Sequence, residues 1–144
     1  PRIPYDEAVK GIESFNGYKA NLNFKIYEYN KAVKESYDSG YEERSFKKVE
    51  QTVIKIGEVI FVSFPYELFS EIGMRINEAV SGLRVLSLSN ANGSEGYFPT
   101  QDQLCRGGYE IGMFKHSDIQ CFADDADFHI VKETLRNMEE FTHE

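Results

Sequence analysis

Residues 53–64 read Val53-Ile54-Lys55-Ile56-Gly57-Glu58-Val59-Ile60-Phe61-Val62-Ser63-Phe64 and contain two runs of β-branched and aromatic residues around Gly57-Glu58. A glycine at the first position of a two-residue turn is typical of a type II′ hairpin. The second run is nearly all apolar, as expected of a strand that is covered on both faces. These residues therefore predict a β-hairpin whose second strand is central in a sheet.

A helix and a third strand are predicted after the hairpin. The stretch Phe64-Pro65-Tyr66-Glu67 is typical of a helix start, and residues 66–80 carry apolar side chains at helical spacing, namely Leu68, Phe69, Ile72, Ile76 and Ala79. Ser81-Gly82 ends this helix, and residues 83–88 form another short apolar strand. Residues 59–88 thus predict a strand–helix–strand unit with two parallel strands.

Helices are also predicted on both sides of this unit. Asp6 and Glu7 after Pro4 indicate a helix start with Asp6 as its cap, and apolar steps of three and four then continue from Tyr18 to Val33. A last helix carries Phe128, Val131, Leu135 and Met138 on one face. We expect an α/β fold, a mixed sheet with a β-hairpin and a βαβ unit flanked by helices. Residues 1–144 form one domain, with a helical segment over 4–37 and an α/β segment over 51–144.

Composition excludes several classes of function. The 144 residues carry a net charge of −8, which argues against a nucleic-acid partner because a polyanion would be repelled. Apolar runs are only a few residues long, whereas a transmembrane helix needs about 20. Cys105 and Cys121 lack the spacing of a metal motif and are expected to be reduced or packed thiols. The chain begins at Pro1 rather than methionine, so we expect a piece of a longer protein, cytoplasmic or secreted.

Four stretches of the chain resemble a known family. Residues 56–69 with Ile72-Gly73-Met74-Arg75-Ile76, the loop from Asn90 to Thr100, and Gly108-Tyr109-Glu110 are similar in order and spacing to the neutral/alkaline ceramidase family. The resemblance covers about residues 51–112. Two features depart from the family pattern: Tyr66 stands where a small residue is usual, and Gly93-Ser94-Glu95 replaces a loop that usually contains an aromatic residue.

The resemblance implies zinc-dependent hydrolysis of the N-acyl amide of ceramide or a related N-acyl lipid. It implies that Glu67 and Tyr97 are zinc ligands and that Tyr109 stabilises the oxyanion. Zinc accepts oxygen ligands and lowers the pKa of a bound water, and a phenol can donate to the developing oxyanion. The family's two histidine ligands lie upstream, and no histidine precedes Glu67 here. We therefore expect the C-terminal part of such an enzyme, inactive without the N-terminal half that is its partner.

Each of these residues also has a simpler interpretation. Glu67 is well placed to complement a helix N-terminus, and Tyr97 and Tyr109 resemble ordinary half-buried tyrosines whose hydroxyls bond to backbone. The loop residues Asn90, Asn92 and Gly96, which we expect near the substrate, also suit positive φ angles, as Gly93 does, or an anion-binding nest of amides.

Three further hypotheses come from the residues alone. A second metal site would use six residues, His116, Asp118, Asp124, Asp125, Asp127 and His129, although helix capping and solvated charge explain them better. A Cys105–His116 nucleophile pair lacks an orienting partner. Finally, the apolar stripe from Tyr18 to Val33 would suit a non-catalytic interaction domain, in which the chain forms a homo-oligomer or docks onto a partner.

Overall fold

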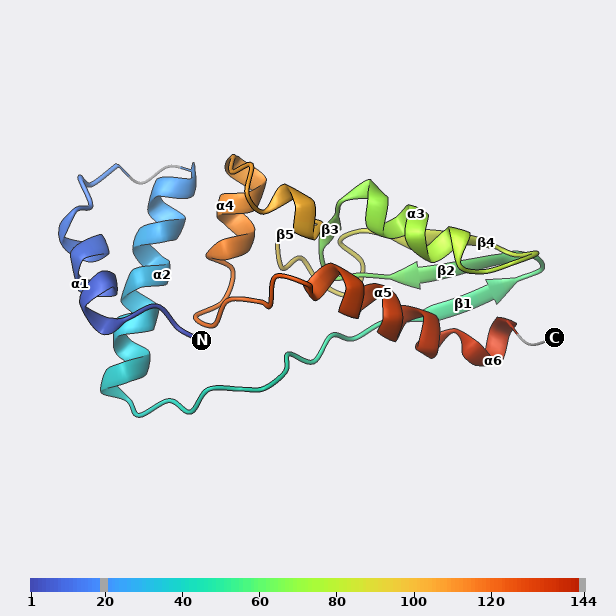
Figure 1. The fold of residues 1–144 in the computed structure, drawn as a ribbon, viewed down its shortest axis with the longest axis horizontal. Coiled ribbons are helices and arrows are strands. Elements are labelled where there is room, and N and C mark those ends of the chain that lie inside the picture. The colour runs from blue at the N-terminus through green and yellow to red at the C-terminus, as the bar shows by residue number, and fades with distance from the viewer. Residues whose placement is uncertain (19–20, 143–144) are drawn as a thin grey trace. The chain divides into compact units, whose positions relative to one another are not determined.

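The computed structural model describes residues 1–18 and 21–142 and has an α/β fold. The chain forms two compact units (Figure 1). Unit 1 contains residues 1–47 and 108–122, and unit 2 contains residues 48–107 and 123–144. The sequence placed residues 108–122 in the α/β segment, whereas in the structure they pack with the N-terminal helices.

The sheet of unit 2 has the predicted hairpin and parallel pair. Strand β1 (Val53–Ile56) pairs antiparallel with β2 (Val59–Ser63), and β4 (Arg84–Leu88) pairs parallel with β2 in the order β1-β2-β4. Gly57 has a φ of 59°, and among the described residues Asn90 and Asn92 are the non-glycine residues with positive φ. A positive φ at Gly57 alone fits the predicted type II′ turn. The central position of β2 is confirmed.

Two helices cover one face of this sheet. Helix α3 (Ser70–Glu78) lies between β2 and β4 in sequence and packs on β4, and α5 (Ala126–Asn137) contacts α3 (Figure 1). A last short helix, α6 (Glu139–Thr142), follows α5. The fully buried apolar side chains of this unit come from β2, the segment after it, α3 and the end of α5: Ile60, Val62, Phe64, Ile72, Ile76 and Met138.

Glu67 does not start a helix. It forms the two-residue strand β3 (Glu67–Leu68), which pairs parallel with β5 (Tyr97–Phe98), and α3 begins only at Ser70. The backbone N–H of Glu67 donates to the Gly96 carbonyl at 2.8 Å, so it is not one of the open N–H groups of a helix end. The prediction was wrong because the apolar residues after Pro65 fit both a strand and a helix period.

The inward face of α5 also differs from the prediction. Phe128 is 54% exposed, whereas Asp127 and Thr134 are buried. The Asp127 carboxylate accepts a hydrogen bond of 2.7 Å from Arg75 Nη1 of α3, and the Arg75 guanidinium lies 4.9 Å from the centre of the Phe128 ring. The ion pair allows a charged residue to occupy a position that the apolar pattern would assign to a hydrophobic one.

Unit 1 is built from three helices. Helices α1 (Tyr5–Glu13) and α2 (Asn21–Asp38) pack along each other around Ala8, Tyr29 and Val33, which confirms the predicted helix pair. Tyr18, expected at the start of the stripe, lies outside α2 and is exposed. Asp6 is not the cap of α1, because Pro4 is the residue before the first helical residue.

Helix α4 (Tyr109–Lys115) packs on α2, and no helix was predicted for these residues. Its glycine permits close contact, because a Cβ added at Gly112 would overlap Leu22 Cδ2 and lie 3.2 Å from Leu22 Cγ. The helix is only seven residues long, so its sequence holds too few turns for a helical period to be seen.

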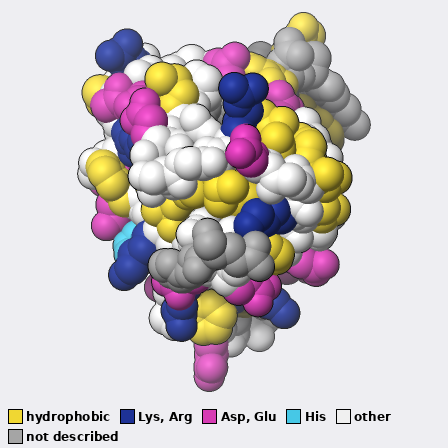
Figure 2. Space-filling model, turned by 90° about the vertical axis from the view of Figure 1, so that its right-hand side faces the viewer, with side chains coloured by type: hydrophobic (Ala, Val, Ile, Leu, Met, Phe, Trp, Pro, Cys, Tyr) yellow, Lys and Arg dark blue, Asp and Glu magenta, His cyan; other side chains and the backbone are white. Residues whose placement is uncertain are grey.

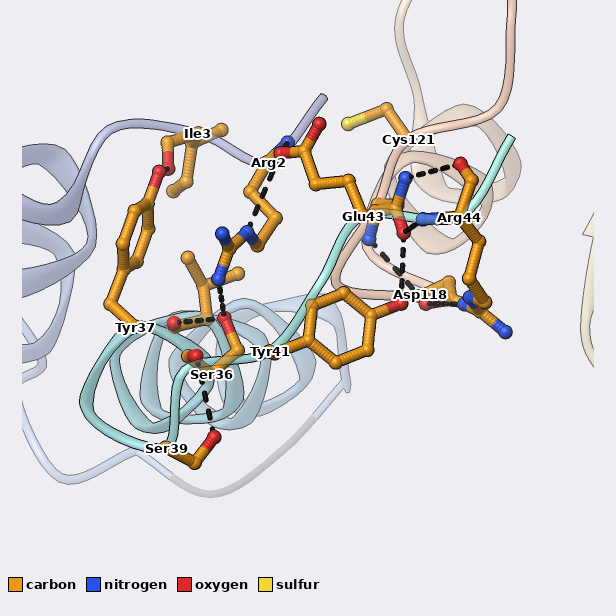
Figure 3. Close-up of polar contacts among 12 residues, drawn as sticks. Arg2, Ile3, Ser36, Tyr37, Ser39, Tyr41, Glu43, Arg44, Asp118 and Cys121 are labelled. Atoms are coloured by element: carbon orange, nitrogen blue, oxygen red, sulfur yellow. Dashed lines mark hydrogen bonds and ion pairs between the residues drawn. The ribbon is translucent and has the colours of Figure 1, made fainter. Parts of the chain in front are cut away.

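Arg2 ties the N-terminus to the end of α2 (Figure 3). Its backbone N–H donates to Glu43 Oε1 at 3.0 Å, its Nη1 donates to Ser36 Oγ at 2.8 Å, and its guanidinium lies 4.0 Å from the Tyr37 ring centre. The hydrogen bond from the Arg2 backbone lowers the pKa of Glu43.

The same region holds residues 118–120 in unit 1 (Figure 3). Arg44 Nη2 donates to both carboxylate oxygens of Asp118, at 2.8 and 2.9 Å, and the Tyr41 hydroxyl donates to Gln120 Oε1 at 2.8 Å. These bonds, made across more than 70 residues of sequence, explain why this segment belongs with the N-terminal helices.

Membrane-spanning potential and surface charge are the two properties for which the composition sets an expectation. Within residues 1–18 and 21–142, each helix is too short or too polar to cross a bilayer. On the face shown in Figure 2, basic and acidic side chains are interspersed, with hydrophobic side chains between them.

Candidate functional site

The β3–β5 pairing brings Glu67 and Tyr97 side by side. They are register partners in the parallel pair, although 30 positions separate them in sequence. Neighbouring strands lie about 4.8 Å apart, and aligned residues of a pleated pair project from the same face. The carboxylate and the phenol therefore leave adjacent backbone positions in the same direction.

That face is not the one that points into the core. Side chains alternate along a strand, and Tyr66 and Phe98 project inward, where they are 1% and 2% exposed and their ring centres lie 4.9 Å apart. Glu67 and Tyr97 occupy the alternate positions and are partly exposed. A partly exposed pair of oxygen donors on a rigid backbone is an arrangement that can bind a cation.

The loop between β4 and β5 is fixed along the backbone that leads into β3. The N–H groups of Asn90 and Glu95 donate to the carbonyls of Tyr66 and Pro65, at 3.0 and 2.6 Å. Positive φ angles at Asn90 and Asn92 and at Gly93 and Gly96 let the loop follow this path. The simpler interpretation of these residues, that they allow positive φ, is thus confirmed.

Asn92 and Gly93 anchor the middle of this loop. The Asn92 amide donates to Thr52 Oγ1 at 2.8 Å and to Ser63 Oγ at 2.9 Å. A Cβ at Gly93 would come within 3.0 Å of Pro65 Cβ, and its φ of 148° suits glycine. Asn90, Asn92 and Gly96 thus fix the backbone of the loop that leads from β4 to β5 and to Tyr97.

Tyr109 lies in unit 1, whereas Glu67 and Tyr97 lie in unit 2. It is the first residue of α4, after Gly108 with a φ of 100°, and its side chain is 45% exposed. An exposed phenol at a helix start is chemically able to donate a hydrogen bond to a substrate oxygen.

The Glu67 carboxylate and the Tyr97 phenol are suited to be part of a zinc site, but not the whole of one. Structural and catalytic zinc sites use three or four protein ligands, and carboxylate oxygen is among the usual ones. Within the described residues, no group of three or more His, Cys, Asp and Glu side chains gathers to hold a metal. Glu67 and Tyr97 therefore fit two positions of a coordination sphere, and further ligands have to come from elsewhere.

The other candidate groups have local partners. His116 Nδ1 lies 2.6 Å from the Gly112 carbonyl, and Cys105 Sγ donates to the Asp102 carbonyl. His129 Nε2 of α5 lies 3.4 Å from Oδ2 of Asp125, the residue just before this helix. The acidic residues 124, 125 and 127 do not form a metal site in the described chain, and Asp125 precedes α5 without a side-chain cap bond.

The sequence did not predict the contact between Tyr66 and Glu95, which lie next to the candidate site. The Tyr66 hydroxyl donates to Glu95 Oε2 at 3.2 Å. Tyr66 immediately precedes Glu67, and Glu95 lies two residues before Tyr97. The sequence marked both positions only as departures from a family pattern. No periodic pattern in the sequence links these two positions.

No protein-family model matches this chain, and no curated protein or solved structure matches it.

Proposed function

We propose that this chain is the C-terminal part of a ceramidase-like, zinc-dependent amidohydrolase that cleaves the N-acyl amide of ceramide or a related N-acyl lipid. The observation that carries the proposal is the register pairing of Glu67 with Tyr97. Aligned positions on one face allow both side chains to reach the same metal ion.

In this proposal the chain's residues have separate tasks. Glu67 and Tyr97 would hold the zinc ion; for Tyr109, which belongs to the other unit, the family resemblance alone implies a hydrogen bond to the developing oxyanion. When bound, zinc supplies a water of lowered pKa that is nucleophilic at neutral pH. The two remaining ligands are histidines from the N-terminal half of the catalytic domain.

A zinc titration tests the proposal directly. We expect the full 144-residue chain to bind zinc through Glu67 and Tyr97, with an ultraviolet difference spectrum of a metal-bound tyrosinate. Glu67→Gln and Tyr97→Phe should each weaken binding by at least about tenfold, because each removes one ligand from a site that has few. Tyr97→Phe should also abolish the tyrosinate signal.

Matched controls separate this site from surface binding. Glu58→Gln changes an exposed carboxylate in the hairpin turn, and Tyr18→Phe changes an exposed phenol in unit 1. Both should leave affinity and spectrum unchanged. Equal affinities of all four variants and the unaltered chain would contradict the proposal.

A second candidate is a non-catalytic interaction domain, and the face of the sheet turned away from α3 and α5 favours it. Ile54, Ile56, Leu86 and Leu88 project from this face and are 41–66% exposed. Parallel sheets are usually covered on both faces. The apolar stripe from Tyr18 to Val33 supports this candidate less, because Tyr29 and Val33 pack inside unit 1.

If a second copy of the chain covers this face, the chain should dimerise at micromolar concentration in sedimentation velocity. Ile56→Lys should then abolish the dimer, and Phe46→Lys, at a residue that is 78% exposed in unit 1, should not. A monomer throughout would remove this candidate.

A further inference from the structure

The β3–β5 pair is too short to fix its own register. It contains two aligned residue pairs, Glu67 with Tyr97 and Leu68 with Phe98. Strands of this length have little stability in isolation. A shift by one residue would turn Tyr97 to the opposite face and separate it from Glu67. Something outside the pair must therefore hold the two strands in alignment.

The contacts just before the pair have this property. The Tyr66 ring is fully buried against Phe98 at a centre distance of 4.9 Å, and its hydroxyl donates to Glu95 Oε2 at 3.2 Å. The backbone N–H of Glu95 donates to the Pro65 carbonyl at 2.6 Å. Residues 65–66 are thus joined to Glu95 by one backbone bond and one side-chain bond.

These bonds act on opposite ends of the short ladder. The Tyr66–Glu95 bond lies immediately before it, and the Phe69 N–H donates to the Phe98 carbonyl at 3.0 Å immediately after it. The ring contact also joins the two strands, because Tyr66 precedes β3 and Phe98 belongs to β5. A slipped register would break the hydroxyl bond and the ring contact together.

We propose that Tyr66 and Glu95 are positioning residues, which hold the Glu67–Tyr97 pair in register and thereby aim both side chains at one cation. This inference rests on the proposed function for the identity of the cation. The alignment itself is independent of it, since the contacts involve neither Glu67 nor Tyr97 side-chain atoms.

Amide hydrogen exchange tests the alignment without any metal. Tyr66→Phe keeps the ring on Phe98 and removes only the hydroxyl, and we expect the Glu67 and Phe69 amides to exchange roughly tenfold faster, because a charge-assisted hydrogen bond is lost. Glu95→Ala should have the same effect. Combining it with Tyr66→Phe should change the exchange rates little further, since both substitutions remove the same hydrogen bond. Glu95→Gln, which keeps an acceptor, should largely restore slow exchange.

Two controls show whether the effect is local. The Arg84 amide, bonded to the Glu58 carbonyl at 2.8 Å at the other end of unit 2, should be unaffected. Tyr41→Phe removes a comparable hydroxyl bond in unit 1 and should leave the Glu67 and Phe69 amides unchanged. The inference is overturned if Tyr66→Phe and Glu95→Ala leave both amides as they were, or speed the Arg84 amide equally.

A zinc titration of the same variants separates this inference from the proposed function. If both hold, Tyr66→Phe weakens zinc binding several-fold and Glu95→Gln does not. If Glu67→Gln and Tyr97→Phe have no effect on zinc but the amides respond, the proposed function fails and the alignment stands. If the amides do not respond and Glu67→Gln abolishes zinc binding, the alignment fails and the proposed function stands. Where Tyr66→Phe does not fold, Glu95→Ala provides the same readouts.

Discussion

At the scale of single residues, unit 2 is held together by polar contacts as well as by its apolar core. Asp127 is 1% exposed and depends on Arg75, whose guanidinium also pairs with Glu71 at 3.0 Å. The second carboxylate oxygen of Asp127, Oδ1, is buried without a hydrogen-bond partner among the described residues. A buried carboxylate with one ion pair is costly to leave without that pair.

Arg75→Met is therefore expected to destabilise the chain by about 3 kcal/mol, because it leaves the Asp127 carboxylate buried and uncompensated. Urea unfolding followed by circular dichroism measures this change. Arg136→Met is the matched control: the Arg136–Glu133 pair is 3.7 Å apart and mostly exposed, so its loss should cost less than about 0.5 kcal/mol. If the two substitutions lower the free energy of unfolding equally, the buried Arg75–Asp127 pair does not stabilise the chain more than an exposed pair does.

At the scale of secondary-structure elements, the glycines of α4 and α3 face neighbouring elements with different amounts of space. In α4, Gly112 lies against Leu22 of α2, so an added methyl group forces that side chain to move. In α3, Gly73 lies against Ser87 of β4, with an added Cβ 3.4 Å from Oγ, which is ordinary contact. The same substitution therefore meets different surroundings in the two helices.

Gly112→Ala should destabilise unit 1 by about 1 kcal/mol, because overpacking outweighs the gain in helix propensity. Gly73→Ala, the control, should be neutral or stabilising by up to about 1 kcal/mol. Thermal unfolding monitored by circular dichroism distinguishes the two. A more stable Gly112→Ala variant would mean that α4 does not pack closely on α2.

Sequence patterns predicted the elements whose residues fit only one period. The alternation and β-branching of residues 53–64 identified β1, β2 and their turn, and the helix pair around Ala8, Tyr29 and Val33 followed from steps of three and four. Strand β3 was missed because Leu68 and Ile72 fit a helix, and its partner lies about 30 residues away. Helix α4 was missed because it is one short segment after two glycines.

The candidate site was predicted in part for a similar reason. Glu67 and Tyr97 were identified from the order of motifs, and the register places them together. The Tyr66–Glu95 bond was not predicted, because a side-chain contact across a loop leaves no period in the sequence. The burial of Asp127 was missed because a charged residue gives no apolar signal.

At the scale of the whole molecule, the proposal requires a second protein segment. In the proposed site Glu67 and Tyr97 supply two oxygen ligands, and the chain's three histidines, His116, His129 and His143, all follow Glu67 and Tyr97 in sequence. The histidine ligands implied by the family resemblance lie on the other side of this segment. If the proposed function holds, catalysis needs these ligands from a second segment.

The chain alone should accordingly release no fatty acid from an N-acyl amide such as ceramide, with or without added zinc. Mass spectrometry of the released acid is a sensitive measurement for this. Hydrolysis that requires Glu67 and stops with a chelator would contradict the incomplete site and would mean that this chain holds all the ligands it needs.

The most direct measurement is a crystal structure of the chain with zinc supplied, in which anomalous scattering locates the metal. The account predicts one zinc ion with a Glu67 carboxylate oxygen and the Tyr97 hydroxyl oxygen each about 2 Å away, so that the two oxygens lie within about 4 Å of each other. Zinc bound elsewhere, or Glu67 and Tyr97 side chains that diverge with no metal between them, would contradict it.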